Sequence, residues 1–281
     1  MAQICAWLDG LPLAIEMAAA QVKWLTPTQI LTQLRTRLIA LTGGPRDLTP
    51  RQQSLSGAIA WSYHLLTPAE RVLFDVVGVF VDGCEETAVQ SVLAKMEIGD
   101  QKSIDNQSLV SNLQSLVEKS LLYRLPQPND EPRYAMLETL REYAQEQLQA
   151  QGSLLAARQA HAEYYGSLAQ IAQSHLVSST DSVIWLQLLD REHHNMRAAL
   201  TWATETETAV PRRARFALEL VENLQLFWYT HGHLRKGRHW LELALSFSQE
   251  VDELHACILN RGKSHETSIH TSFPNSGRIC G

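Results

Sequence analysis

Apolar residues recur at intervals of three and four along most of this chain, and this spacing constrains its fold more than any other feature. One such stripe consists of Ile30, Leu31, Leu34, Leu38 and Leu41. A stripe of this kind covers one face of an α-helix, because a helix completes a turn in about 3.6 residues. Similar stripes return after residue 54 and again after residue 153, so we expect a mainly α-helical protein.

Proline and threonine mark where several of these helices begin. Thr26 precedes Pro27, and Thr67 precedes Pro68. Threonine is a good N-cap because its hydroxyl accepts a backbone N–H, and proline suits the first helical position because its missing N–H would have no partner there. Pro12 can occupy the same position in an earlier helix. Further helices are predicted near residues 54–66, 85–95, 106–119 and 138–151.

Two short β-prone runs interrupt the helical pattern. They are residues 121–125 and 133–137, and a proline-rich turn over 126–132 joins them. Runs of this kind joined by a turn predict a β-hairpin. Three or more helices followed by a small hairpin is the outline of a winged helix, so we predict a winged-helix unit here.

The second half of the chain has the pattern of helical hairpins. Phe216–Tyr229 and Leu234–Phe247 predict two helices separated by a turn at residues 231–233. This pair has about the length of a tetratricopeptide (TPR) unit. A single hairpin of this kind needs neighbours to bury its apolar faces. After Leu254 the helical stripe disappears, and we expect disorder.

These observations predict a mainly α fold made of successive parts. We expect the end of a small helical domain at 1–42, a linker at 43–53, a winged-helix-like domain with a short β-hairpin at 54–152, a TPR-like helical region at 153–254, and a disordered tail at 255–281.

Charge and composition exclude several classes of function. The 281 residues carry a formal net charge of −6, which gives no general attraction to nucleic acid or to anionic membranes. The winged-helix region 54–150 has seven Lys and Arg against fourteen Asp and Glu, a net charge of −7. We therefore do not expect direct DNA binding.

The expected location follows from the cysteines and the hydropathy. The four cysteines form no CxxC pair, which favours reduced thiols. No apolar run is long enough to span a membrane. We expect a cytoplasmic protein without membrane contact.

Several strings, taken in order, resemble one family. Residues 1–250 resemble the bacterial signal-transduction ATPases of the STAND class, which carry an NB-ARC-type nucleotide-binding module. The matching strings are Leu8–Glu16 (LDGLPLAIE), Leu41–Leu48, Trp61–Tyr63, Met136–Ala144, His193–Leu200 and Gly232–Leu241. The specificity lies in their order, because no single string is rare.

The resemblance implies a nucleotide site shared with a P-loop domain that this sequence lacks. In that family, Gly10, Leu11 and Pro12 would line the adenine side of bound ADP or ATP. Met136, Leu137 and Glu138 stand where the family has a Met-His-Asp motif whose histidine contacts the phosphates. Leu137 cannot donate a side-chain hydrogen bond, so the sequence departs from the family there. From the residues alone, Pro12 can equally be a structural helix start, and Glu138 can cap the helix that follows.

The chain lacks the residues that hydrolyse a nucleotide. Arg261-Gly-Lys-Ser264 is a partial P-loop match, but a full motif would need glycine where Cys257 stands, and no acidic strand end resembles a Walker B motif. We therefore expect no catalytic residues and no ATPase activity. His193, His194, His231, His233, His239, His265 and His270 fit no zinc-ligand spacing, and each of these is predicted to lie at the surface or in a turn.

Our leading hypothesis is a regulatory fragment of a STAND ATPase in transcriptional or signalling control. It would couple the ADP or ATP state of the missing P-loop domain to a protein partner or inducer that binds the helical repeats. By itself it is expected to bind nucleotide weakly or not at all. One alternative is a stand-alone helical scaffold that binds protein partners. A less favoured alternative is a winged-helix DNA-binding regulator.

Overall fold

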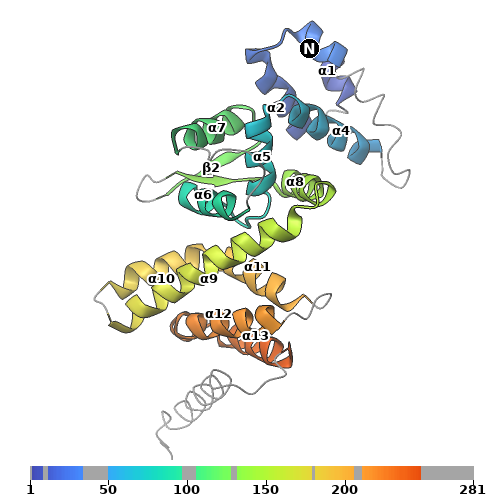
Figure 1. Cartoon of the computed structure of the whole chain (residues 1–281). Helices are drawn as coiled ribbons and strands as arrows, with labels where there is room; N and C mark the ends of the chain where they lie inside the picture. The colour runs from blue at the N-terminus through green and yellow to red at the C-terminus, as the bar shows by residue number, and fades with distance from the viewer. Residues whose placement is uncertain are drawn as a thin grey trace, which may run out of the picture. The chain divides into compact units, whose positions relative to one another are not determined.

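A computed structural model describes residues 2–8, 12–33, 50–96, 106–127, 132–178, 181–205 and 211–247. The chain divides into two compact units, residues 1–164 and 165–281. Their boundary falls inside helix α9 (Leu154–Ser178). Figure 1 shows that helices dominate both units and that the strands belong to the first unit. The predicted mainly α fold class is confirmed.

The first unit begins with short helices packed around a tryptophan. They are α1 (Ala2–Trp7), α2 (Pro12–Ala20), the 3-10 helix η1 (Gln21–Lys23), a helical segment at 27–33, and α4 (Pro50–His64). Leu8, Ile30 and Trp61 are buried together at their centre. The Trp61 indole donates a hydrogen bond to Gln33 Oε1 at 3.1 Å, so its polar edge is satisfied inside the core.

The predicted helix start at Thr26 is confirmed. The Gln29 amide donates to Thr26 Oγ1 at 3.3 Å, and the Thr26 amide donates to Gln29 Oε1 at 2.8 Å. This reciprocal pair is a capping box, which satisfies two backbone donors that the helix itself leaves free. The rest of the predicted stripe, from Leu34 to Leu41, lies outside the described residues.

The remainder of the first unit has the element order of a winged helix. Its elements are α5 (Pro68–Val77), β1 (Cys84–Glu85), α6 (Glu86–Lys95), α7 (Asn106–Glu118), β2 (Tyr123–Leu125), β3 (Arg133–Ala135) and α8 (Glu138–Ala150). The strands form an antiparallel sheet in the order β1-β3-β2. The predicted hairpin and winged-helix unit are confirmed. Strand β1 was not predicted, since two residues carry no periodic signal.

Helix α5 is the central helix of this unit. Leu73, Phe74 and Val77 are buried. Helices α6, α7 and α8 all contact α5, and Gly78 at its end lies so close to α8 that an added Cβ would be 2.5 Å from the Ala144 Cβ. Such close packing on several sides makes α5 a rigid element.

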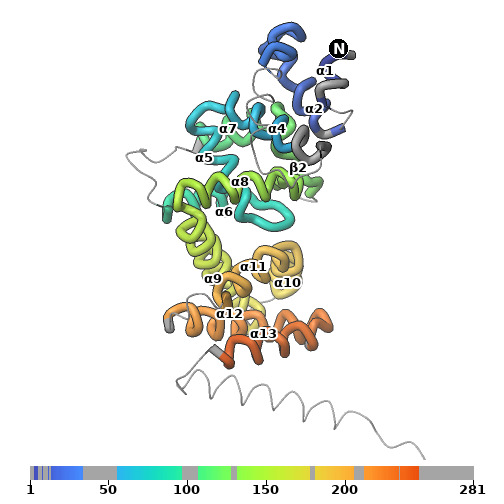
Figure 2. The backbone as a smooth tube through the Cα atoms, turned by 90° about the vertical axis from the view of Figure 1, so that its right-hand side faces the viewer, coloured from blue at the N-terminus to red at the C-terminus, as the bar shows by residue number. Residues whose placement is uncertain are grey.

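The described part of the second unit is entirely helical. It contains the second half of α9, then α10 (Ser182–Arg191), α11 (His193–Thr204), α12 (Pro211–Thr230) and α13 (Leu234–Phe247). Helices α12 and α13 lie side by side, as Figure 2 shows. Gly232 closes the turn between them with φ of +71°, a left-handed conformation that suits glycine. The helices are confirmed, whereas the TPR-like assignment stays a prediction.

One histidine prediction is wrong. His193, expected at the surface, is only 7% exposed. Its ring stacks on that of His233 at a centroid distance of 5.2 Å and meets the edge of Phe227. Burial comes first among the causes that lower its pKa to about 4, and nearby His233 and Lys236 lower it further. The helical stripe of α11 failed to predict this because it does not show which neighbouring turn covers a residue.

The segments around the predicted linker and tail are described only in part. Helix α4 begins at Pro50, so residues 50–53, which we assigned to the linker, are helical. The other residues of the linker and the whole 255–281 tail lie outside the described part of the chain. The predicted domain boundaries stay predictions. Among the described helices, none is both long and apolar enough to cross a membrane.

Candidate functional site in the winged helix

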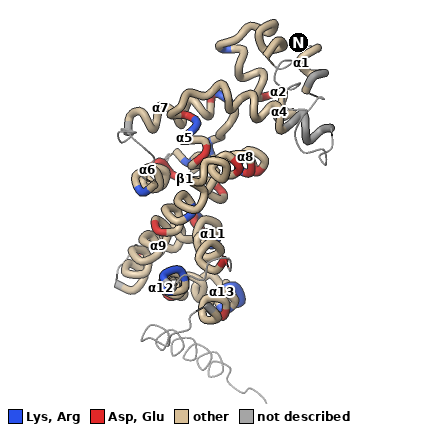
Figure 3. The backbone as a smooth tube through the Cα atoms, turned by 45° about the vertical axis from the view of Figure 1, so that its right-hand side comes forward, with Lys and Arg blue, Asp and Glu red and all other residues tan. Residues whose placement is uncertain are grey.

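Helix α7 is the helix that directly precedes the β2–β3 hairpin of the winged helix. Leu109, Leu113 and Leu116 point into the core. The opposite face is exposed and polar but carries no cation, since its residues include Gln107, Ser111 and Gln114. Figure 3 accordingly shows α7 almost without charged residues, while acidic residues gather on α8. This face can donate and accept hydrogen bonds, but it offers no charge to a phosphate backbone.

Most described cations of the winged-helix region make contacts within the protein. Lys95 pairs with Glu163, Lys119 with Glu70, and Arg141 with Glu138. Arg133 is 2% exposed and donates to backbone carbonyls. Arg124, on β2, is exposed and lies 5.8 Å from the centre of the Tyr134 ring. Of the two arginines in the described part of the hairpin, Arg124 is therefore the one that an external anion can reach, since Arg133 is buried.

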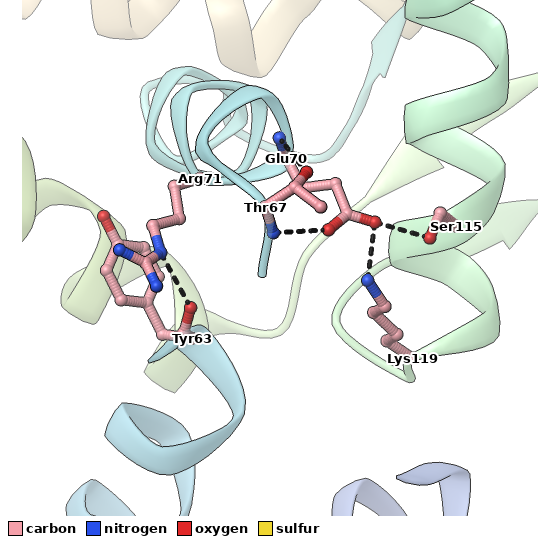
Figure 4. A network of polar contacts seen from close by, with 6 residues as sticks. All are labelled: Tyr63, Thr67, Glu70, Arg71, Ser115 and Lys119. Atoms are coloured by element: carbon pink, nitrogen blue, oxygen red, sulfur yellow. Dashed lines mark hydrogen bonds and ion pairs between the residues drawn. The ribbon is translucent and has the colours of Figure 1, made fainter. Parts of the chain in front are cut away.

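Glu70 connects the start of α5 to the end of α7, as Figure 4 shows. Its Oε2 accepts the Thr67 amide at 2.8 Å, and its Oε1 accepts Ser115 Oγ at 2.6 Å and Lys119 Nζ at 2.5 Å. Burial alone would raise the pKa of Glu70, but the hydrogen bonds from Lys119, Ser115 and the Thr67 amide outweigh it and lower the pKa. Glu70 therefore carries a buried negative charge that is well satisfied.

Arg71, the next residue, makes contacts on the other side of α5. Its Nε donates to the Tyr63 carbonyl at 3.3 Å, and its second terminal nitrogen donates to the His64 carbonyl at 2.7 Å. Both carbonyls belong to the last turn of α4, and the Tyr63 carbonyl also accepts the Leu66 amide at 3.1 Å. The first turn of α5 thus caps the end of α4 through Arg71 and is hydrogen-bonded to the end of α7 through Glu70.

Asp75 is a buried carboxyl between three elements. Its Oδ2 accepts the Tyr63 hydroxyl at 2.9 Å and the Gln151 amide at 3.0 Å. The residue is 2% exposed. Burial raises the pKa of Asp75 to about 6, although the hydrogen bonds from Gln151 and Tyr63 act in the opposite direction. Asp75 joins α4 and the C-terminal end of α8 to α5.

Sequence reasoning missed these polar residues, although one of them had a visible signal. Thr67 and Glu70 form a complete capping box at the start of α5, and the pattern Thr-x-x-Glu is the sequence signature of that motif. No local pattern indicates the contacts of Glu70 with α7 or those of Asp75 with α4, because both depend on tertiary packing.

The residues that the resemblance implicates in nucleotide binding are only partly described. Pro12 is the first residue of α2 and is exposed, as its N1 assignment predicts. Gly10 and Leu11 lie outside the described residues. Leu137 is the N-cap of α8, makes no side-chain cap hydrogen bond and is 43% exposed. Glu138 is the first residue of α8, where an acidic side chain is favoured, but the N-cap is Leu137 and the Glu138 carboxylate accepts hydrogen bonds from Arg141.

Within the described ranges, no three or more His, Cys, Asp and Glu side chains are grouped so that they could hold a metal ion.

Comparison with known proteins agrees with the winged-helix topology. Residues 85–149 match a family model described as a winged helix-turn-helix domain. The match runs from β1 through the hairpin to α8. No solved structure was found to match the chain.

The chain also has curated relatives in mycobacteria. It is 36% identical over 244 residues to proteins of Mycobacterium tuberculosis and Mycobacterium bovis that are each named a "putative HTH-type transcriptional regulator". That alignment covers 86% of this chain but 26% of each relative. An uncharacterized protein of Mycobacterium tuberculosis is 31% identical over 150 residues, which is 53% of this chain and 37% of that protein. The chain thus contains a winged helix-turn-helix domain and is homologous to a segment of larger proteins named as transcriptional regulators.

Proposed function

We propose that this chain is a regulatory module of a transcriptional regulator, in which the winged helix transmits the state of neighbouring domains and does not itself contact DNA. The supporting observation is that most cationic side chains of the winged helix are already bound to other groups of the protein. Lys119 and Arg133 are held in buried contacts, Lys95 and Arg141 are paired with carboxylates near the surface, and region 54–150 has a net charge of −7. A surface that binds phosphates needs accessible positive charge.

We further propose that the state being transmitted is that of a nucleotide site of the STAND type. The ordered motifs from Leu8–Glu16 onward support this proposal. ADP or ATP would be bound mainly by a P-loop domain outside this sequence, with Gly10, Leu11 and Pro12 on the adenine side. Nucleotide exchange would shift the population between two packings of the module. A protein partner or inducer would bind the helical region, and the protein would act in the cytoplasm.

The isolated 281-residue chain is expected to bind ADP too weakly to saturate and to release no phosphate from ATP. The physical reason is the missing loop of backbone amides and lysine that would hold the phosphates. Isothermal titration with ADP, with adenosine as the control ligand, measures this directly. Saturable micromolar binding of ADP, or steady phosphate release, would show that a nucleotide site forms without a P-loop.

Direct DNA binding is the second candidate function. The winged helix-turn-helix family match and the names of the relatives favour it. In this case the exposed polar face of α7 would enter a groove, and Arg124 of the hairpin would contact a phosphate. Gln107, Ser111 and Gln114 could read base edges by hydrogen bonding.

Titration of a labelled random duplex distinguishes the two candidates. The leading proposal predicts no saturation at about 10⁻⁴ M protein in physiological salt, which is the weak end of non-specific DNA binding. The DNA-binding candidate predicts tighter, salt-dependent binding, and Arg124→Gln would reduce the salt slope by about 1. Arg212→Gln on α12 is the matched control, because it removes an exposed arginine outside the winged helix.

A further inference from the structure

We propose that Glu70 and Arg71 form a relay that couples the end of α4 to the end of α7. The two residues are neighbours in the first turn of α5, and their side chains point to opposite sides of it (Figure 4). Arg71 holds the last carbonyls of α4, and Glu70 holds Ser115 and Lys119 at the end of α7. This inference rests on the proposed regulatory role, for which it supplies a route within the first unit.

The relay acts through a rigid intermediate. Helix α5 is packed against α6, α7 and α8, so its first turn cannot adjust independently at its two sides. A displacement of the last turn of α4 therefore moves the guanidinium of Arg71, and the same backbone turn carries the carboxylate of Glu70. Coupling of this kind can be carried by a contiguous set of packed and hydrogen-bonded groups, and these contacts form one.

The contacts at the α7 end are strong enough to transmit such a displacement. The side chains of Glu70 and Lys119 are 5% and 11% exposed, so their ion pair is only weakly screened by solvent. By contrast, Lys23 of η1 and Glu118 of α7 form a second ion pair at 3.0 Å in which both side chains are 56% exposed. An exposed pair contributes little, so we assign the coupling to Glu70 and not to Lys23.

Hydrogen–deuterium exchange of the full 281-residue chain tests the relay at both ends. Arg71→Met is expected to raise exchange at the end of α7, over about residues 113–120, as well as at the end of α4. Glu70→Gln is expected to raise exchange at the end of α4, over about residues 60–66, as well as in α7. A coupling of typical size between two sites makes each remote effect about fivefold or more. The double variant should show less than the product of the two single effects.

Control variants separate the relay from a local or general loss of structure. Arg141→Met removes an ion-paired arginine from α8, and Lys23→Met removes the exposed pair at α7; neither should change exchange at the end of α4. Arg71→Lys, which keeps a donor, should reduce the remote effect. The relay is overturned if each variant acts only at its own contact, or if exchange rises uniformly through α5, α6 and α8. Neither result would contradict the proposed function, because the nucleotide and DNA titrations test that function independently of the relay.

Discussion

Replacing Arg133 with methionine is expected to destabilise the winged helix by about 3 kcal/mol, since a hydrogen bond made by a charged group contributes about 1.5–3 kcal/mol. The Arg133 guanidinium donates to the carbonyls of Asp82 and Gly83 at 3.0–3.3 Å. These two residues form the turn before β1 and have φ of +65° and +91°. Methionine retains much of the side-chain volume but donates no hydrogen bond. The substitution would therefore remove the guanidinium hydrogen bonds that hold a turn in which Asp82 has a left-handed conformation.

Arg124→Met on the neighbouring strand is the matched control. Arg124 is exposed, so its replacement should change stability by less than about 0.5 kcal/mol. Chemical denaturation gives the stability of each variant, and hydrogen exchange over β1 and β3 locates the effect. If Arg133→Met remains within about 1 kcal/mol of the wild type, the desolvation cost of the buried guanidinium balances its hydrogen bonds, as can happen for buried charges.

Replacing Asp75 with asparagine is expected to remove a pH dependence of stability. Burial raises the pKa of Asp75 from 3.8 to about 6 in the folded protein. The native state therefore binds more protons than the unfolded state between these pH values, and the free energy of unfolding falls as pH rises through this window. Above about pH 6 the carboxyl is ionised in both the folded and the unfolded state, so the free energy of unfolding no longer changes with pH through this group. It is then lower than at acidic pH, because the charge stays buried between Tyr63 and Gln151.

Asparagine keeps an acceptor for Tyr63 and Gln151 but cannot ionise. The free energy of unfolding of Asp75→Asn, relative to the wild type, should thus be about 2 kcal/mol higher at pH 8 than at pH 4.5. This difference follows from the rise in the pKa of Asp75 from 3.8 to about 6 on folding. Denaturation at the two pH values measures this difference. Asp190→Asn, on the exposed surface of α10, is the control and should follow the wild type. An equal response of both variants would mean that Asp75 is not the group responsible.

Local sequence patterns predicted the helices well because their signals are local. Thr26, Thr67 and the prolines that follow them fix where helices begin, since capping involves residues within one turn. The stripes of α7 and α12 point to a buried face whatever covers it. The hairpin was visible as two β-prone runs, whereas β1 was not, because it exists only by pairing with β3 (Cys84 opposite Tyr134).

The candidate site was predicted less well, and particular residues show the reason. The stripe of α11 gave no sign that His193 is covered by the turn carrying His233. Glu138 had the position of a capping residue, yet Arg141 one turn later binds its carboxylate. In both cases the decisive contact comes from a residue that the local pattern does not indicate.

The sequence by itself determined the helical class, the winged-helix order and the net negative charge of that unit, because periodicity, capping and composition require no knowledge of distant contacts. Only the tertiary structure decided which charges remain accessible and which become internal. Glu70 meets Ser115 and Lys119 across separations of 45 and 49 residues, and Asp75 meets Gln151 across 76. Such pairs form when packed helices bring polar groups together away from water, where an unpaired group is costly and a paired one is retained.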